Sequence, residues 1–274
     1  MLLSIILITG LIFSVLSMIC FDWVVDFSDF WIVLVAFVVG IFASIFVIVF
    51  IIWIGSLFVD KNKDYVNPKK FYVRMVLRVC EFALTITRTK VNIRGLDKLP
   101  LDKKFLFITN HQSLFDSVAT QWTLRGFNLQ FVMKNSLLKV FLIGPYLHAC
   151  GFIAIDRSNP REGIKAINKS VDRITNDVSS IVICPEGTRS GGYEMGEFHN
   201  GSFKIATKAS CDIVLCAIQN TCKIMKRFPW KSTEIYFDVI EVIKPEDYEG
   251  KSTQEISDYA YKVIKEDLNE LPKY

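Results

Sequence analysis

Residues 105–116 read FLFITNHQSLFD, and this stretch decides how the rest of the chain is interpreted. Its first part, Phe105–Thr109, is apolar and β-branched, which predicts a short buried strand. The polar residues that follow end in Ser113-x-x-Asp116, a pattern typical of a helix start. A strand that leads through a polar loop into a helix indicates an α/β fold.

Similar β-rich runs recur along the chain. They lie at Leu129–Met133, Phe152–Ile155, Ile181–Cys184, Ile213–Ile218 and Ile235–Ile243. Helical patterns lie between most of them: Asn159-Pro160 opens one, and the capping box Ser252-x-x-Glu255 opens the last. The sequence therefore predicts an α/β fold with a mixed, mostly parallel sheet flanked by helices. In such sheets, functional sites gather in the loops beyond the strand ends.

The first 59 residues are strongly apolar. Hydrophobic residues make up 51% of the chain and the mean hydropathy is +0.33, but charged residues are absent from 1–21 and from 30–59. Because about 20 apolar residues span a bilayer, each run predicts one helix of an N-terminal transmembrane hairpin. A cleaved signal peptide is the alternative for the first run, but a basic leading segment and a small-x-small cleavage pattern near Cys20–Asp22 are both missing.

Charge predicts how the hairpin is oriented. The loop between the runs carries Asp22, Asp26 and Asp29, whereas six Lys or Arg follow between residues 61 and 78. The positive-inside rule then predicts an integral membrane protein whose following domain lies on the cytoplasmic face. Beyond residue 59 there are 32 Lys and Arg and 25 of the 28 acids, and 32 less 25 leaves +7. That excess suits anionic headgroups and phosphorylated substrates, with ordinary surface solvation as the alternative.

Residues 60–90 predict a basic amphipathic helix. Asn67-Pro68 is typical of an N-cap followed by proline at the first helical position, and polar residues recur at steps of three and four from Lys70 to Arg88. We interpret this helix as lying in the membrane interface, with packing on the domain core as the alternative. The predicted organisation is therefore two transmembrane helices at 1–59, an interfacial helix at 60–90 and a cytoplasmic α/β domain at 91–274.

Three polar motifs follow predicted strands. In the first, His111 is suited to take up a proton near neutral pH, and the carboxylate of Asp116 would fix the ring's tautomer. Five residues turn a continuous helix by about 140°, so this pair meets only if a helix begins between them. The second motif, CPEGTRS at 184–190, offers close backbone approach at Gly187 and a phosphate-matching fork at Arg189. The third is GFIAIDR at 151–157.

Each motif alone has a structural alternative: a packed histidine, a surface turn, or a buried strand with a solvated tip. Together and in this order they resemble the motifs of the 1-acylglycerol-3-phosphate acyltransferases (lysophosphatidate acyltransferases) of the glycerol-phosphate acyltransferase superfamily. The family's N-H-x-S-x-x-D is matched at 110–116, its G-x-I-x-I-D-R at 151–157 and its P-E-G-T-R-S at 185–190.

The resemblance extends over about residues 90–245. Phe131–Lys134 is similar to the family's strand that ends in lysine, and Phe198, Gly201 and Ala206 resemble its F-x-x-G helix start. One block departs from the family pattern, because Leu215 and Cys216 stand where a proline is usual. That departure leaves the catalytic motif intact and bears on the identity of the acceptor.

The resemblance implies a reaction. A fatty acyl group would pass from an acyl thioester, either acyl-CoA or an acyl carrier protein thioester, to the sn-2 hydroxyl of lysophosphatidate, giving phosphatidate. His111 would be the general base and Asp116 would orient it. The implied substrate-binding residues are Glu186, Gly187, Thr188, Arg189, Arg157 and Lys134. Membrane lipids are expected partners.

Other functions are disfavoured or left open by the sequence. Seven cysteines without a C-x-x-C pair favour core packing in a reduced compartment, and we expect no cofactor and no metal site. Neither G-x-x-x-x-G-K-[ST] nor G-x-G-x-x-G occurs, and the apolar spans argue against a nucleic-acid partner. The remaining alternatives are acylation of another lysolipid or of glycerol 3-phosphate, and a non-catalytic membrane lipid-binding protein.

Overall fold

The computed structural model describes residues 2–21, 30–156 and 159–274. The chain divides into two compact units, Met1–Lys61 and Asn62–Tyr274. This boundary falls close to residue 59, where the second of the two charge-free runs ends in the sequence.

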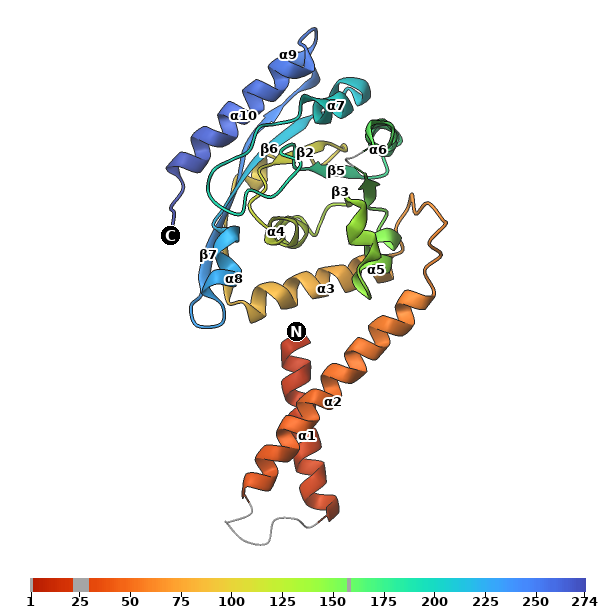
Figure 1. The fold of residues 1–274 in the computed structure, drawn as a ribbon, viewed down its shortest axis with the longest axis vertical. Helices are drawn as coiled ribbons and strands as arrows, with labels where there is room; N and C mark the ends of the chain where they lie inside the picture. Colours follow the sequence, from red (N-terminus) through yellow and green to blue (C-terminus); the bar gives the residue numbers. More distant parts are fainter. Residues whose placement is uncertain (1, 22–29, 157–158) are drawn as a thin grey trace. The chain divides into compact units, whose positions relative to one another are not determined.

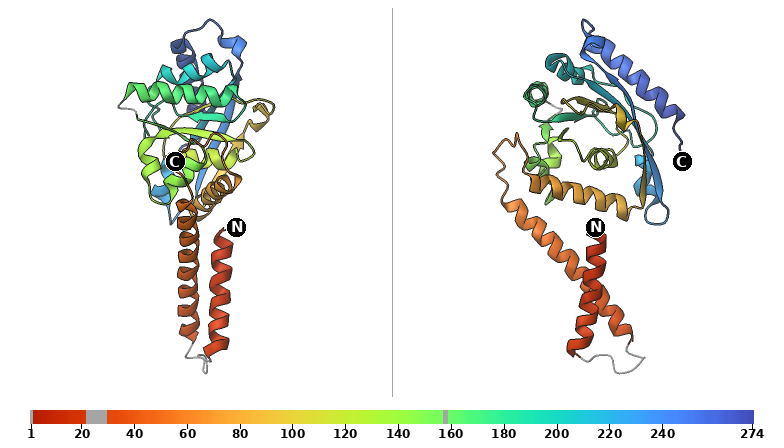
Figure 2. Two further views of the ribbon diagram at one scale, coloured as in Figure 1. Left: turned by 90° about the vertical axis from the view of Figure 1, so that its right-hand side faces the viewer. Right: turned by 180° about the vertical axis from the view of Figure 1, so that it is seen from behind.

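The first unit is a pair of antiparallel helices, α1 (Leu2–Phe21) and α2 (Phe30–Leu57), which lie side by side in Figure 2. Small residues let the two backbones approach closely. A Cβ built on Gly40 would lie 2.9 Å from Cβ of Phe13 and 3.0 Å from Cα of Gly10. One turn away, the hydroxyls of Thr9 and Ser44 are 2.6 Å apart. Both helices are long and apolar enough to cross a membrane, and small residues at the crossing are typical of transmembrane pairs.

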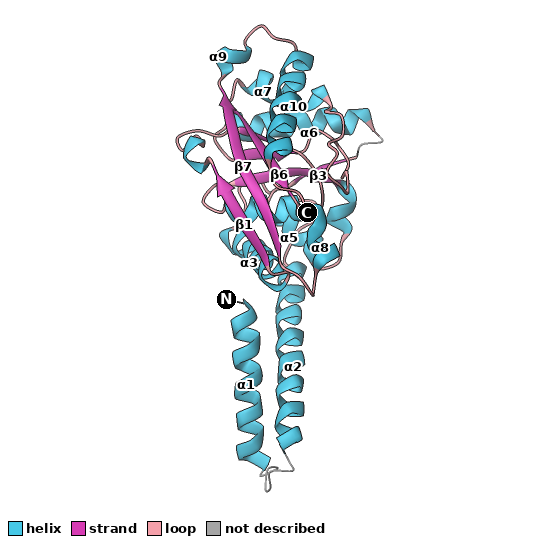
Figure 3. Ribbon diagram, turned by 90° about the vertical axis from the view of Figure 1, so that its left-hand side faces the viewer, coloured by secondary structure: helices cyan, strands magenta, loops and turns pink. Residues whose placement is uncertain are grey.

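The second unit is built on a seven-stranded sheet with the order β1-β7-β6-β2-β5-β3-β4. Its strands are β1 (Thr89–Arg94), β2 (Leu106–Thr109), β3 (Leu129–Lys134), β4 (Ile153–Ile155), β5 (Ser180–Ile183), β6 (Ile213–Gln219) and β7 (Thr233–Ile243). Strands β2 to β6 run parallel to one another. Strand β7 is antiparallel to β6, and β1 is parallel to β7 at the end of the sheet (Figure 3).

Helices cover both faces of this sheet (Figure 1). The α-helices are α3 (Lys70–Ile86), α4 (Phe115–Thr123), α5 (Ile143–Ala149), α6 (Pro160–Thr175), α7 (Lys204–Ala209), α8 (Ile224–Arg227), α9 (Pro245–Tyr248) and α10 (Thr253–Glu270). Short 3-10 helices are η2 (Leu96–Lys98), η3 (Asn135–Lys139), η4 (Asn200–Phe203) and η5 (Thr221–Lys223).

The alternation of side chains along the strands produces two apolar cores. Leu106 and Ile108 of β2 point into a core shared with α6, α7 and α10. Phe105 and Phe107 point to the opposite face, where the second core includes Leu124 at the end of α4. Burial on both faces explains why β2, β5 and β6 are almost continuously apolar in the sequence.

The predicted fold class is confirmed, and the predicted strands match the observed ones to within one or two residues. Strand β1 was not predicted. In its sequence, TKVNIR, apolar and polar residues alternate, as in a mostly exposed strand at the edge of a sheet. It therefore lacks the continuous apolar run by which the other strands were predicted.

The predicted start of the amphipathic helix was wrong in detail. Helix α3 begins at Lys70 with Lys69 at the N-cap, so Asn67 and Pro68 lie before the helix rather than at its first turn. One side of α3 packs on α4 and α5 and buries Tyr72 and Leu84. The remaining side leaves apolar side chains exposed, so core packing accounts for only part of its apolar surface.

Candidate active site

The histidine motif at 110–116 and the P-E-G-T-R-S motif at 185–190 meet at the carboxyl end of the parallel strands. The loop after β2 carries His111 and Gln112, and the loop after the neighbouring strand β5 carries residues 184–191. Their backbones are joined directly: the N–H of Ser190 donates to the carbonyl of His111 at 2.9 Å, and the N–H of Gly191 donates to that of Gln112 at 3.1 Å. The two loops are therefore joined into one platform.

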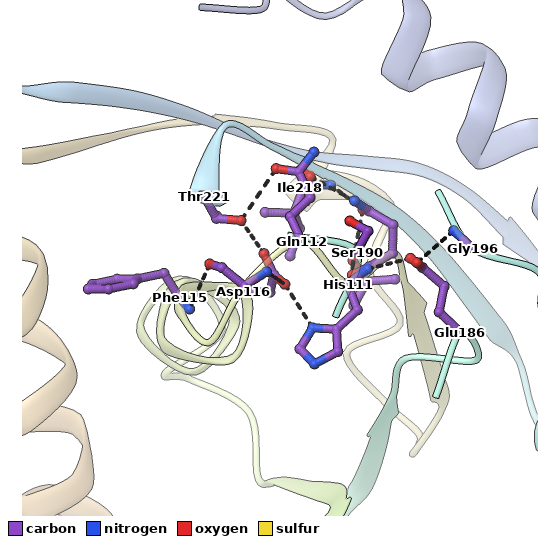
Figure 4. A network of polar contacts seen from close by, with 12 residues as sticks. His111, Gln112, Phe115, Asp116, Glu186, Ser190, Gly196, Ile218 and Thr221 are labelled. Atoms are coloured by element: carbon purple, nitrogen blue, oxygen red, sulfur yellow. Dashed lines mark hydrogen bonds and ion pairs between the residues drawn. The ribbon is translucent and has the colours of Figure 1, made fainter. Parts of the chain in front are cut away.

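The predicted contact between His111 and Asp116 is present. Nδ1 of His111 lies 2.8 Å from Oδ2 of Asp116, with the histidine side chain 14% and the aspartate side chain 1% exposed (Figure 4). Helix α4 begins between the two residues, which brings the carboxylate back toward the loop. Ser113 stabilises that start, since its backbone N–H donates to Asp116 and its Oγ accepts from the N–H of Phe115.

Because Nδ1 of His111 contacts Asp116, the other ring nitrogen, Nε2, is the one that can take a proton from a reacting group. A carboxylate on Nδ1 holds the proton there, so Nε2 is the basic nitrogen of the neutral ring. The same carboxylate stabilises the imidazolium that forms when Nε2 takes up a proton. The pair can therefore serve as an oriented general base.

Thr221 completes the environment of Asp116 and was not identified from the sequence. Its hydroxyl donates to Oδ1, the carboxylate oxygen that does not face His111 (Figure 4). Thr221 is 1% exposed and opens η5, directly after β6. Both oxygens of this buried carboxylate are thus engaged, as a buried charge requires.

Buried amides hold the loop that carries His111. The side chain of Asn110 makes two hydrogen bonds with the backbone of Ile218 in β6, at 2.9 and 2.8 Å. Gln112 donates to Gln219 at 2.6 Å, and Gln219 donates to the carbonyl of Leu268 in α10 at 3.0 Å. The C-terminal helix is therefore connected to the catalytic loop through side chains of β6.

Glu186 links the two loops of the platform. Oε1 accepts from the backbone N–H of His111 at 2.6 Å, and Oε2 accepts from that of Gly196 at 2.8 Å (Figure 4). Burial raises the pKa of Glu186 above its usual value, and the two backbone hydrogen bonds oppose that rise. The carboxylate was predicted to bind substrate, and in the structure its hydrogen bonds go to the protein backbone.

The other predicted substrate-binding residues lie around this platform. Gly187 has φ +71°, and a Cβ there would lie 3.1 Å from the ring of His199, so a side chain would be strained. Thr188 and Arg189 follow it and are exposed. Lys134 is the exposed last residue of β3, next to β5 in the sheet, and thus lies at the same end of the strands. Arg157 lies outside the described residues.

The departure from the family pattern coincides with an irregularity in the sheet. The register of β6 against β7 shifts between Leu215 and Cys216, and both side chains are fully buried. Proline within sheets is confined largely to edges and bulges, because it cannot donate a backbone hydrogen bond. The position expected for proline is therefore one where the hydrogen-bond pattern between β6 and β7 is interrupted. In this chain Leu215 and Cys216 occupy it, and their side chains belong to the apolar cores.

The part of the chain that carries this site is similar to known acyltransferases. Residues 90–219 match the family model described as Acyltransferase. A chloroplastic 1-acyl-sn-glycerol-3-phosphate acyltransferase of Arabidopsis thaliana is 31% identical over 137 residues, which cover 50% of this chain and 38% of that protein. The 1-acyl-sn-glycerol-3-phosphate acyltransferase of Pseudomonas aeruginosa is 32% identical over 149 residues, which cover 52% of this chain and 56% of that protein. The chain thus spans less than two thirds of the length of these relatives.

The fold also resembles a solved structure. The crystal structure of PlsC, described as a 1-acyl-sn-glycerophosphate acyltransferase from Thermotoga maritima, superposes with a TM-score of 0.64. The match covers 82% of this chain and 88% of that one, at 20% sequence identity, and supports the fold.

Residues 90–219 are thus similar to the acyltransferase family. Within that class, the resemblance to the 1-acylglycerol-3-phosphate acyltransferase family predicted from its motifs is confirmed by these relatives.

Proposed function

We propose that this chain is a 1-acylglycerol-3-phosphate O-acyltransferase, which transfers a fatty acyl group from an acyl thioester to the sn-2 hydroxyl of lysophosphatidate and forms phosphatidate. The observation that carries the proposal is the 2.8 Å contact between Nδ1 of His111 and the buried carboxylate of Asp116. The names of the similar proteins supply the acceptor and product.

The reaction needs one base and no acyl-enzyme intermediate. Nε2 of His111 takes the proton of the acceptor hydroxyl, and the hydroxyl oxygen attacks the carbonyl carbon of the thioester. The tetrahedral intermediate then collapses, the carbon–sulfur bond breaks, and the departing thiolate takes the proton back from His111. Asp116 holds the ring in the required tautomer throughout. No cofactor takes part beyond the acyl donor, which is acyl-CoA or an acyl carrier protein thioester.

Ser113 and Cys184 are side chains of the two motifs that a covalent route could use as a nucleophile. The hydroxyl of Ser113 caps the start of α4, and Cys184 is a half-buried residue just after β5. The proposed route therefore predicts that the double variant Ser113→Ala/Cys184→Ala keeps the rate of acyl transfer within about tenfold of the wild type. The decrease that remains would come from the loss of the Ser113 cap at the start of α4. An acyl-enzyme trapped on either residue of the wild type would overturn this route.

We propose that cationic groups around the platform bind the phosphate of the acceptor. Arg189 and Lys134 are exposed at the carboxyl end of neighbouring strands, and Arg157 follows β4 in the sequence. Glu186 contributes by fixing the loop from which Arg189 projects. Arg189→Ala should raise acceptor KM at least about tenfold with little change in kcat, whereas His111→Ala should lower kcat. An unchanged acceptor KM in Arg189→Ala would refute the assignment of Arg189.

We also propose that the helices α1 and α2 form a transmembrane hairpin and that the acyltransferase unit lies on the cytoplasmic face. The length and composition of both helices and the basic residues after α2 support this placement. A lysolipid acceptor and a phospholipid product both reside in the bilayer, so a tethered enzyme meets its substrate there.

Acylation of a different lysolipid or of glycerol 3-phosphate is the second candidate, favoured by the departure at Leu215 and Cys216. The test is a panel of acceptors at equal concentration in mixed micelles: lysophosphatidate, other lysophospholipids and glycerol 3-phosphate, each with acyl-CoA and with acyl carrier protein thioester. The highest kcat/KM is expected for lysophosphatidate. A higher value for another acceptor would replace it, and no transfer to any acceptor would favour a lipid-binding protein.

A further inference from the structure

The connection between β6 and β7 presents two large apolar side chains to solvent. Met225 is 61% exposed and Trp230 is 86% exposed, although every residue of the preceding strand β6 is buried. We refer to residues 225–231 as the β6–β7 tip. Exposed tryptophan and methionine indicate a surface that contacts something other than water.

The tip is held in place by the rest of the unit. Ile224, which precedes it, is fully buried and packs with Ala119 of α4 and Ile235 of β7. Within the tip, Arg227 donates from Nε to the carbonyl of Ser232 at 3.0 Å, and its guanidinium lies 4.2 Å from the ring centroid of Tyr274. The outward position of Trp230 is therefore built into the fold.

The charge of the connection is entirely basic. Between Thr221 and Ser232 the sequence has four Lys or Arg and no acid. Two of the basic residues, Lys226 and Lys231, are exposed beside Met225 and Trp230. A tryptophan flanked by lysines is the composition of a membrane interface, where the ring lies at headgroup level and the ammonium groups meet anionic lipids. Lysine is instead depleted at the cores of protein–protein interfaces.

The tip lies at the same end of the sheet as the candidate active site. Because β7 is antiparallel to β6, it begins where β6 and β2 end, which is also where His111 lies. Thr221, the donor to Asp116, belongs to the same connection as the tip. A surface that seats the tip on lipid would bring the base to the bilayer.

Helix α3 extends this surface. Thr89 pairs with Thr233, so the C-terminal end of α3 lies next to the tip, and Figures 1 and 2 show α3 running from there toward α5. Exposed apolar side chains follow its course: Ile86 (41%) and Phe71 (51%) on α3, and Phe141 (74%) just before α5. The exposed Arg74 and Arg78 lie on α3 as well.

We propose that the β6–β7 tip, continued by α3 and the turn at Phe141, inserts into the headgroup region of a bilayer that contains anionic phospholipid. This contact belongs to the acyltransferase unit itself and is additional to the N-terminal helices. It does not depend on the reaction assigned to the site.

The test is photocrosslinking of the full chain in liposomes of phosphatidylcholine and phosphatidylglycerol. The photoreactive amino acid p-benzoylphenylalanine replaces Trp230 in one preparation and Leu101 in another. Leu101 is equally exposed, at 86%, but follows the opposite end of β1. A third preparation carries the label at Phe46 of α2, 69% exposed, which reports insertion of the hairpin.

Lipid adducts, detected by mass spectrometry of the protein, are expected at positions 230 and 46, at least about fivefold above position 101. The adducts at position 230 should fall when Lys226→Glu and Lys231→Glu are introduced, while those at position 46 stay unchanged, because the charges act only on the tip. Adducts at 46 with none at 230, or crosslinks from 230 to protein in place of lipid, would overturn the proposal and leave the hairpin standing.

Discussion

At the scale of single residues, the candidate site is organised around the carboxylate of Asp116. One oxygen meets His111 and the backbone of Ser113, and the other accepts from Thr221. A carboxylate that swung away would leave His111 without its orienting partner and would be buried without hydrogen bonds, at a cost of several kcal/mol. Thr221 therefore positions the base through Asp116 without touching the substrate.

Thr221→Val removes the hydroxyl and keeps the shape of the side chain. Since a hydrogen bond to a charged group contributes about 1.5–3 kcal/mol, we expect kcat to fall by about tenfold to a hundredfold with acceptor KM within a factor of about three. Thr221→Ser, which keeps the hydroxyl, is the matched control and should remain close to the wild type. Equal losses in both variants, or none in Thr221→Val, would argue against a positioning role.

Sequence reasoning found His111 and Asp116 because both belong to one short motif, which together with two later motifs resembles the pattern of a known family. It did not find Thr221, which is 105 residues from Asp116 and has no motif around it. The structural role of Glu186 was not predicted from the sequence either. The P-E-G-T-R-S motif on a loop suggested a carboxylate that binds a ligand. The fold shows instead that the carboxylate accepts hydrogen bonds from the backbone N–H groups of His111 and Gly196.

At the scale of elements, the strongly apolar strands and capped helices were predictable, and those shaped by their surroundings were not. The capping box at Ser252 and the Asn159-Pro160 start predicted α10 and α6, and both helices begin there. Strand β1 and the start of α3 were missed or misplaced, because edge pairing with β7 and packing on α4 and α5 decide them.

The capping box of α10 should contribute to stability. Ser252 Oγ accepts from the N–H of Glu255, and the carboxylate of Glu255 accepts from the N–H of Ser252. Ser252→Ala should lower the Tm by about 2–4 °C in a thermal unfolding scan at neutral pH, as expected for loss of one cap. Ser252→Asp, another favourable N-cap, should restore most of the Tm, and a Tm unchanged in Ser252→Ala would contradict this account.

At the scale of the whole molecule, pH should act on folding through a half-buried acid that the site does not use. Burial, together with the neighbouring carboxylates of Asp238 and Glu270, raises the pKa of Asp267 on α10 to about 6. The folded state therefore favours the protonated form. The resulting stability is fully present below the unfolded pKa, near 3.8, and is lost as the pH rises through about 6.

Asp267→Asn should remove this dependence. Above pH 6 the free energy of unfolding of the variant should exceed that of the wild type by an amount on the order of 1 kcal/mol after allowance for solvent screening, so the variant should unfold at a higher temperature. Near pH 4 the two proteins should unfold at similar temperatures. Thermal scans at both values check this, and a variant that is less stable at pH 8 than the wild type would contradict it.

Under the proposed function, the first unit anchors the chain in the bilayer and the second unit carries out acyl transfer. An apolar helix pair and a basic, mixed α/β unit in one chain match an enzyme whose acceptor and product stay in the bilayer. The β6–β7 tip adds a second lipid contact at the end of the sheet where His111 lies.

The most direct test of the account is acyl transfer by the purified, detergent-solubilised protein, with lysophosphatidate as acceptor and long-chain acyl-CoA or acyl carrier protein thioester as donor. The wild type should form phosphatidate, and a folded His111→Ala variant, checked by its Tm, should lose at least about a thousandfold in kcat through loss of the base. Phosphatidate formed equally by the variant would contradict the role of His111, and a folded wild type that forms none with either donor would contradict the proposed reaction.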